Sequence, residues 1–159
     1  MPCGFAIQSV AEGMACEIAE MLGDLRSEIV AQTNTQAFNF DKAETATRLA
    51  EFLSREAYFV FVVRDSCGLA VGFVAFYESR ALYAEGEFGT ISELYVRPSF
   101  RSLGLGARLI DQSKNFALAR GWKRLEVTTP PLPSFERTLA FYEREGFSIT
   151  GGRKVRLLL

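Results

Sequence analysis

The sequence contains no histidine, although it is 159 residues long. Catalysis by serine–histidine–aspartate or cysteine–histidine groups is therefore excluded, and so is a zinc site of the H-E-x-x-H type. Any acid–base chemistry must instead use carboxylates, tyrosine, cysteine, lysine or water.

Cysteine is also scarce. The three cysteines, Cys3, Cys16 and Cys67, are widely separated, odd in number and without C-x-x-C spacing. We therefore expect reduced thiols, and neither a disulfide framework nor a metal site. The N-terminus lacks the basic start and apolar run of a signal peptide, and no apolar stretch is long enough to cross a bilayer. These absences predict a cytoplasmic protein without a membrane partner.

Neither sign of charge dominates the chain. It has 18 basic and 19 acidic residues and a formal net charge of -1. This balance gives no general electrostatic reason to expect a nucleic acid or an anionic membrane as partner. The length and the hydrophobic content of 48% are those of one globular domain with a substantial core.

The hydrophobic patterning alternates between strand and helix periods along the chain. Asp41 is expected to cap the second helix, and the unbroken apolar run after residue 57 predicts a strand covered on both faces. This order predicts a single α/β domain over residues 1–159. The expected strands are 4–10, 57–65, 69–79, 88–98, 123–129 and 148–159, and the expected helices are 11–32, 41–57, 104–122 and 134–147.

The stretch VRPSFRSLGLGARLI, residues 96–110, joins a strand to a helix through Gly104 and Gly106. The first N–H groups of a helix lack intrahelical partners, and the helix dipole places partial positive charge there. Glycines at this point allow a phosphate to approach the backbone, although they also allow a simple tight turn. The spacing is not that of a P-loop, and a dinucleotide-binding motif would need a third glycine where Leu109 stands.

Two segments of this chain resemble the signatures of the GCN5-related N-acetyltransferase (GNAT) family. LYVRPSFRSLGLGARLI, residues 94–110, is similar to its acetyl-CoA-binding motif R/Q-x-x-G-x-G/A, and TLAFYEREGF, residues 138–147, resembles its second signature. The order of elements fits that family from residue 5 to the end. The resemblance implies an α/β fold with a mixed, mostly antiparallel central sheet, splayed middle strands and flanking helices.

The resemblance also implies acetyl-CoA as the acetyl donor and no metal. In the family, the backbone of the strand before the glycine loop bonds the pantetheine arm, a role that maps onto Leu94, Tyr95 and Val96. The pyrophosphate lies on backbone N–H groups that map onto Arg101, Ser102, Leu103, Gly104, Leu105, Gly106 and Ala107.

Three residues are candidates for the proton transfers. Tyr142 matches the family tyrosine that lies near the CoA sulfur and acts as general acid, although it could be only a core residue. The general base is open: Glu93 lies where some members carry an acidic pair, Glu126 aligns with a glutamate used by ribosomal-protein acetyltransferases, and water could act with either. Phe135 replaces a common cofactor-binding asparagine, and Ser134 could substitute for it.

The acceptor implied by the resemblance is an amine, and the family builds its site from segments that map onto residues 24–40 and 77–88. Glu78, Glu85 and Glu87 in the second segment would suit a cationic amine. We expect direct acetylation of a primary amine of a small molecule. The alternatives are a protein N-terminus or lysine as acceptor, or a non-catalytic acyl-CoA-binding module. A homodimer through strand ends or the C-terminal strand is also expected.

Overall fold

The computed structural model describes residues 4–34, 39–130 and 135–159. The chain falls into two units, residues 1–128 and 129–159. The first unit contains strands β1 (Ala6–Ser9), β2 (Tyr58–Arg64), β3 (Ala70–Ala81), β4 (Gly86–Val96) and β5 (Leu125–Val127), and helices α1 (Ala15–Thr33), α2 (Lys42–Ser54) and α3 (Leu105–Ala119). The second unit contains helix α4 (Glu136–Arg144).

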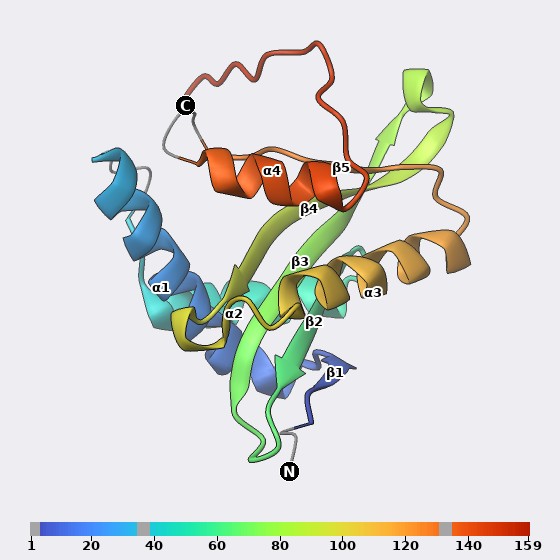
Figure 1. Cartoon of the computed structure of the whole chain (residues 1–159). Coiled ribbons are helices and arrows are strands. Elements are labelled where there is room, and N and C mark those ends of the chain that lie inside the picture. The colour runs from blue at the N-terminus through green and yellow to red at the C-terminus, as the bar shows by residue number, and fades with distance from the viewer. Residues whose placement is uncertain (1–3, 35–38, 131–134) are drawn as a thin grey trace. The chain divides into compact units, whose positions relative to one another are not determined.

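The five strands form one sheet in the order β1-β2-β3-β4-β5. All neighbours pair antiparallel except β4 and β5, which pair in parallel. Helices α1 and α2 cover one face of the sheet and α3 covers the other (Figure 1). This arrangement confirms the expected α/β fold with a mixed, mostly antiparallel sheet.

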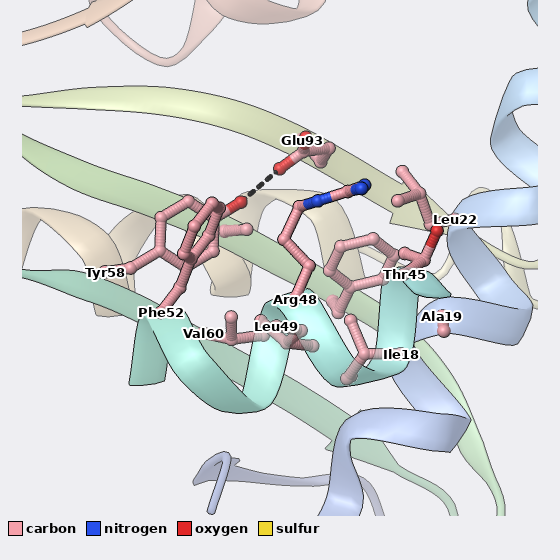
Figure 2. A pocket seen from close by; sticks show the side chains of 12 residues that line it. Ile18, Ala19, Leu22, Thr45, Arg48, Leu49, Phe52, Tyr58, Val60 and Glu93 are labelled. Atoms are coloured by element: carbon pink, nitrogen blue, oxygen red, sulfur yellow. Dashed lines mark hydrogen bonds between the residues drawn. The ribbon is translucent and has the colours of Figure 1, made fainter. Parts of the chain in front are cut away.

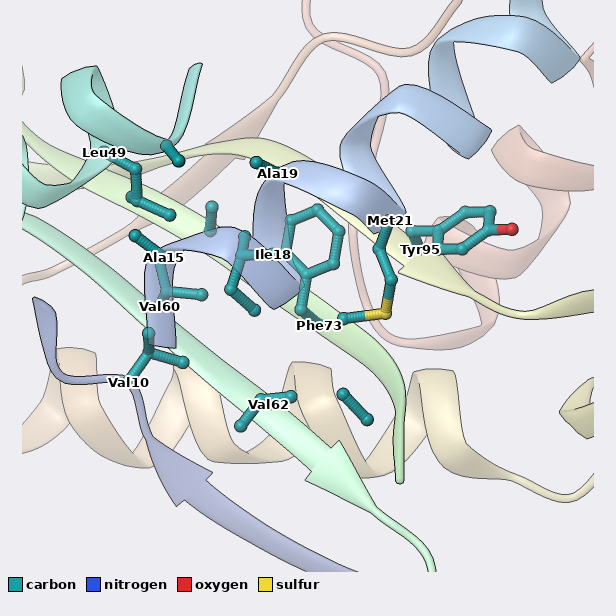
Figure 3. Packing of buried hydrophobic residues seen from close by; sticks show 13 residues of the cluster. Val10, Ala15, Ile18, Ala19, Met21, Leu49, Val60, Val62, Phe73 and Tyr95 are labelled. Atoms are coloured by element: carbon teal, nitrogen blue, oxygen red, sulfur yellow. The ribbon is translucent and has the colours of Figure 1, made fainter. Parts of the chain in front are cut away.

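Strand β2 is covered on both faces, as its unbroken apolar run predicts. Val60 and Val62 point into the core under α1 and α2, and Figure 3 shows them beside Ile18 and Phe73. On the opposite face the ring of Phe59 lies 4.6 Å from that of Phe116 in α3. Each fully buried side chain of this size contributes about 1.5–3 kcal/mol relative to exposure, so both layers hold the sheet in place.

The start of α2 is fixed by the cap that the sequence predicts. Asp41 has an extended backbone, and its Oδ1 accepts a hydrogen bond of 2.8 Å from the Glu44 N–H. Such a cap is worth about 1 kcal/mol. It sets where the helix begins, and therefore which α2 side chains face the sheet.

The expected C-terminal strand at 148–159 is wrong. These residues adopt no strand and are all exposed, including Val155, Leu157, Leu158 and Leu159. A strand needs a hydrogen-bonding neighbour, and Gly151 and Gly152 weaken strand formation because glycine has no side chain to pack. The homodimer suggested for this strand stays a prediction. β5 is also shorter than the expected 123–129.

Two smaller expectations concern cysteines and membranes. Cys16 and Cys67 are free thiols at the surface, and Cys3 lies outside the described residues. In the described ranges, no helix has both the length and the apolar character that a bilayer crossing requires.

Strands β3 and β4 approach closely at Gly72, and this contact generates a stability prediction. A Cβ at this position would lie 2.8 Å from the carbonyl oxygen of Tyr95, which is backbone and cannot swing aside. Gly72→Ala should lower the free energy of unfolding by about 1–3 kcal/mol, measured by urea denaturation. Gly13→Ala is the control, because its Cβ would meet nothing within 4 Å. Equal stability of the two variants would contradict this packing.

Candidate active site

Strand β4 separates from β5 after only a short contact. The two strands pair at Gly89–Leu125, Thr90–Glu126 and Ile91–Val127. Beyond Ile91, no strand within the described residues pairs with this side of β4, although β3 continues to pair with the other side. We call the unpaired side of residues 92–96 the open edge. It confirms the expected splaying of the middle strands.

The backbone groups that face the open edge follow from strand alternation. The N–H of Arg97 donates to the Val71 carbonyl on β3 over 2.8 Å. Since successive residues of a strand face opposite sides, Tyr95 also directs its backbone groups toward β3. Leu94 and Val96 direct theirs toward the open edge. Leu94 and Val96, two of the three residues expected to bond the pantetheine arm, therefore offer backbone groups at the open edge. The third, Tyr95, bonds toward β3, and its ring is buried in the hydrophobic core.

The glycine loop after β4 leads into α3 through two residues with left-handed backbone. Ser102 has φ 65° and Gly104 has φ 77°. A Cβ at Gly104 would meet nothing within 4 Å, so this glycine is required by its backbone conformation and not by crowding. The first helical bond is donated by the Arg108 N–H to the Gly104 carbonyl over 3.1 Å.

The first turn of α3 presents unused hydrogen-bond donors. Leu105, Gly106 and Ala107 precede the first helical bond, so their N–H groups have no intrahelical acceptor. These donors and the positive end of the helix dipole favour an anion at this point. The geometry thus gives the loop the anion-binding form that the sequence suggests.

The arginines near this loop bind the protein itself. Arg101 pairs with Glu28 of α1 at 2.8 Å, and its Nε donates to the Val96 carbonyl over 2.8 Å. Arg108 donates from Nη2 to the Phe5 carbonyl over 3.1 Å. Much of the Arg101 charge is therefore compensated by Glu28, whereas Arg108 bonds only to a neutral carbonyl and keeps its charge beside the backbone donors.

A β-bulge at Ser92 turns two adjacent side chains to the same face of the sheet. Ala75 pairs with Glu93 and Phe76 pairs with Ile91, so Ser92 is the extra residue on β4. The Tyr58 hydroxyl lies 2.9 Å from Ser92 Oγ and donates to Glu93 Oε2 over 2.8 Å. Ser92 Oγ also donates to Glu93 Oε2. Both side chains therefore lie on the face covered by α1 and α2.

Tyr58 holds Glu93 with a neutral donor. Burial, with the negative charge of Glu93 beside it, raises the pKa of the Tyr58 phenol well above its ordinary value. The phenol therefore keeps its proton at neutral pH and continues to donate it. Figure 2 shows this hydrogen bond at one end of a pocket lined by α1, α2 and the sheet.

Glu126 lies on the same face of the sheet as Glu93. It pairs with Thr90, which pairs in turn with Tyr77, and the Tyr77 ring stacks 6.3 Å from that of Tyr58. Arg124 Nη1 is 3.8 Å from Glu126 Oε2, too long for a hydrogen bond. That buried oxygen has no hydrogen-bond partner in the described parts of the chain. Both candidate bases therefore share one face.

Tyr142 lies on α4, in the second unit. The Gly146 N–H bonds to the Glu143 carbonyl and the Phe147 N–H to the Tyr142 carbonyl, at 3.1 and 3.0 Å, with Gly146 at φ 99°. This Schellman cap folds Phe147 back until its ring is 5.4 Å from that of Tyr142. Burial raises the pKa of Tyr142 to about 12. The phenol is thus protonated at neutral pH and has a proton to donate.

The acidic residues expected to recognise a cationic amine are already paired. Glu78 accepts a 3.1 Å hydrogen bond from Trp122 and contacts Arg80 and Arg120. Glu85 pairs with Lys123 at 3.2 Å, and Glu87 pairs with Arg80 at 3.3 Å. These carboxylates stabilise the β3–β4 hairpin and its surroundings. Each already has a basic partner, so they are poorly suited to hold an ammonium group.

Sequence reasoning missed the residues that complete the pocket beside Glu93. Thr45 and Arg48 of α2 and Tyr58 of β2 line this pocket. The helical spacing of Thr45, Arg48 and Leu49 could have placed them on one face of α2, but not opposite Glu93. Ser134 lies outside the described residues, and Phe135 occupies the N-cap position of α4 without a side-chain cap bond. No group of three candidate metal ligands occurs among the residues that the structure describes.

Known proteins share both sequence and fold with this chain. Residues 25–147 match the model of the Acetyltransferase (GNAT) family. A stretch of 67 residues is 38% identical to an uncharacterized N-acetyltransferase of Archaeoglobus fulgidus, covering 42% of this chain. The match spans 46% of the archaeal protein, which is less than half of its length.

Two solved structures cover nearly the whole chain. The ribosomal-protein-alanine N-acetyltransferase of Brucella melitensis biovar Abortus 2308 is 22% identical with a TM-score of 0.72, over 98% of this chain and 100% of that one. An aminoglycoside N-acetyltransferase in complex with CoA is 14% identical with a TM-score of 0.80, over 99% and 97% of the two chains. At these identities the likeness concerns the fold. The match to the family model, however, takes in both signature segments, and the chain belongs to the acetyltransferase (GNAT) family.

Proposed function

We propose that this protein transfers the acetyl group of acetyl-CoA directly to a primary amine of a small molecule. The observation that carries the proposal is the open edge of β4, followed in the chain by the unused N–H groups at the start of α3. Membership of the family supports acetyl-CoA as the donor, and a protein of similar fold has been solved with CoA.

The residues of the first unit fit this donor. Amide groups of a pantetheine arm can bond to the backbone of Leu94 and to the N–H of Val96 as a further strand would, while the Val96 carbonyl already accepts from Arg101. A diphosphate fits the donors of Leu105, Gly106 and Ala107, where the helix dipole favours negative charge. Acetyl-CoA would supply the acetyl group as an activated thioester.

The chain's own groups can carry the proton transfers. Glu93, held by Tyr58, accepts a proton from the acceptor ammonium, which leaves a neutral amine able to attack. The new C–N bond forms as the C–S bond breaks, and Tyr142 protonates the leaving thiolate. Overall the nitrogen loses two protons, of which one ends on the CoA thiol and one reaches solvent. Glu126 is the alternative base.

Two other functions make different predictions for one assay. Acetylation of a protein N-terminus or lysine is supported by the fold similarity to the Brucella protein, a ribosomal-protein-alanine N-acetyltransferase. A non-catalytic acyl-CoA-binding module would bind acetyl-CoA without releasing thiol. Thiol release from acetyl-CoA, measured with a panel of small amines and peptides, separates all three.

Gly106→Glu should abolish acetyl-CoA binding, because a carboxylate at the first turn of α3 would repel the diphosphate. We expect at least about a 100-fold loss of affinity by calorimetry, in line with the loss of several charge-assisted hydrogen bonds. Gly106→Ala, which adds no charge, should retain most of the affinity. Unchanged binding by a folded Gly106→Glu protein would rule out this site for the diphosphate.

Tyr142→Phe should lower the single-turnover rate by about 10²- to 10⁴-fold, the usual worth of general acid catalysis. Acetyl-CoA affinity should change little. Because the pKa of Tyr142 is raised to about 12, this phenol should produce no alkaline limb in the rate profile between pH 7 and 10. Tyr83→Phe, which removes an exposed hydroxyl, is the control. A wild-type rate in Tyr142→Phe would make Tyr142 a core residue only.

Glu93→Gln should reduce kcat/KM by about 10²- to 10⁴-fold if this carboxylate is the general base. The glutamine keeps the shape and can still accept the Tyr58 hydrogen bond, so the fold should persist. Glu126→Gln is the paired comparison, and a larger loss there than at Glu93 would transfer the role to Glu126.

A further inference from the structure

A pocket of about 210 Å³ lies between helices α1 and α2 and the sheet (Figure 2). Its walls are mostly apolar and include Ile18 of α1, Leu49 of α2 and Phe73 of β3. This volume is below the roughly 300–1,000 Å³ of pockets that enclose drug-sized ligands. At about 30 Å³ per water molecule, it holds roughly seven. It can therefore enclose a group about as large as one amino-acid side chain.

Two side chains of opposite charge face this pocket, Glu93 from β4 and Arg48 from α2. Glu93 is held by the Tyr58 hydroxyl, whereas Arg48 is exposed and forms no ion pair with any described residue. Figure 2 shows the Arg48 guanidinium extending from α2 across the pocket toward β4. The two charges do not neutralise each other, so an occupant can use both.

An α-amino acid matches this arrangement. Its ammonium group complements Glu93, its carboxylate complements the planar donors of Arg48, and both are attached to the carbon that carries the side chain. An apolar side chain entering between Ile18, Leu49 and Phe73 would lose contact with water, which is favourable in proportion to the apolar area buried.

Other amines match the pocket less well. A polyamine or an aminoglycoside would bring further ammonium groups toward the Arg48 guanidinium, and a sugar ring would leave its hydroxyl groups against apolar walls. A protein lysine would bring no carboxylate to Arg48. A peptide N-terminus would offer only a neutral carbonyl there, and hydrogen bonds between two charged groups are stronger.

We propose that the acetyl acceptor is a free α-amino acid with an apolar side chain of about the size of leucine or phenylalanine. This inference rests on the proposed acetyl transfer and adds its substrate class. The acceptor ammonium gives its proton to Glu93, the C–N bond forms as the C–S bond breaks, and the products are an N-acetyl amino acid and CoA. Arg48 selects for the carboxylate and takes no part in the proton transfers.

The test is a calorimetric titration of the full chain saturated with CoA, which cannot donate an acetyl group. L-leucine should bind at least about tenfold more tightly than L-leucinamide, because a charge-assisted hydrogen bond is lost with the carboxylate. In Arg48→Gln this ratio should fall to near one, and Arg48→Lys should restore part of it. Arg55→Gln is the matched control, because Arg55 is an exposed arginine after α2 and outside the pocket.

A second variant tests the pocket itself. Thr45→Phe should fill the space and weaken L-leucine binding while leaving acetyl-CoA binding intact. Equal affinity for leucine and leucinamide, no leucine binding, or a ratio unchanged in Arg48→Gln would overturn the inference. Acetylation of spermidine, an aminoglycoside or a peptide in preference to leucine would overturn it while leaving acetyl transfer standing. Failure to bind acetyl-CoA at all would instead overturn the proposed function.

Discussion

The arrangement of the site depends on one constraint, the parting of β4 from β5 next to the bulge at Ser92. Pairing with β5 ends at Ile91, and the extra residue on the β3 side follows immediately. A bulge increases the local twist of its strand. From this point on, only one of the two edges of β4 has a hydrogen-bonded neighbour strand. One edge stays bonded to β3, while the other leaves the backbone groups of Leu94 and the N–H of Val96 open, because the Val96 carbonyl accepts a hydrogen bond from Arg101 Nε.

The same bulge also determines the face of the sheet to which the side chains of Ser92 and Glu93 point. In a regular strand, Ser92 and Glu93 would face opposite sides of the sheet. With one extra residue, both reach the Tyr58 hydroxyl on the α1 and α2 face. At this single irregularity, β4 has both an open backbone edge and an oriented carboxylate. The neighbouring elements hold this part of β4 in place. Gly72 permits the close contact with β3, and the Asp41 cap fixes α2 above the pocket.

Much of the fold could be predicted from the sequence because its signals are local. The Asp41 cap, the apolar run of β2 and the left-handed Gly104 each depend on residues close in sequence. The glycine loop has the anion-binding form for the same reason. The prediction of a strand at residues 148–159 failed because β-branched and leucine residues indicate strand propensity but cannot supply a pairing partner.

The features that sequence reasoning missed depend on contacts between distant residues. The bulge appears only in the register of β3 against β4, because a serine before a glutamate has no distinctive local pattern. The ion pair of Arg101 with Glu28 joins residues that are far apart in the chain, so no local pattern indicates it. Arg48 carries no motif either. Its position opposite Glu93 becomes visible only when α2 is packed on the sheet.

We propose that the donor binds along the open edge and at the start of α3. The most direct test of this proposal is the ¹⁵N amide NMR spectrum of the protein titrated with CoA. We expect the largest shifts in the amide signals of Leu94, Val96, Leu105, Gly106 and Ala107. Signals that stay in place at these positions while others move, for example those of β1 and β2, would contradict it.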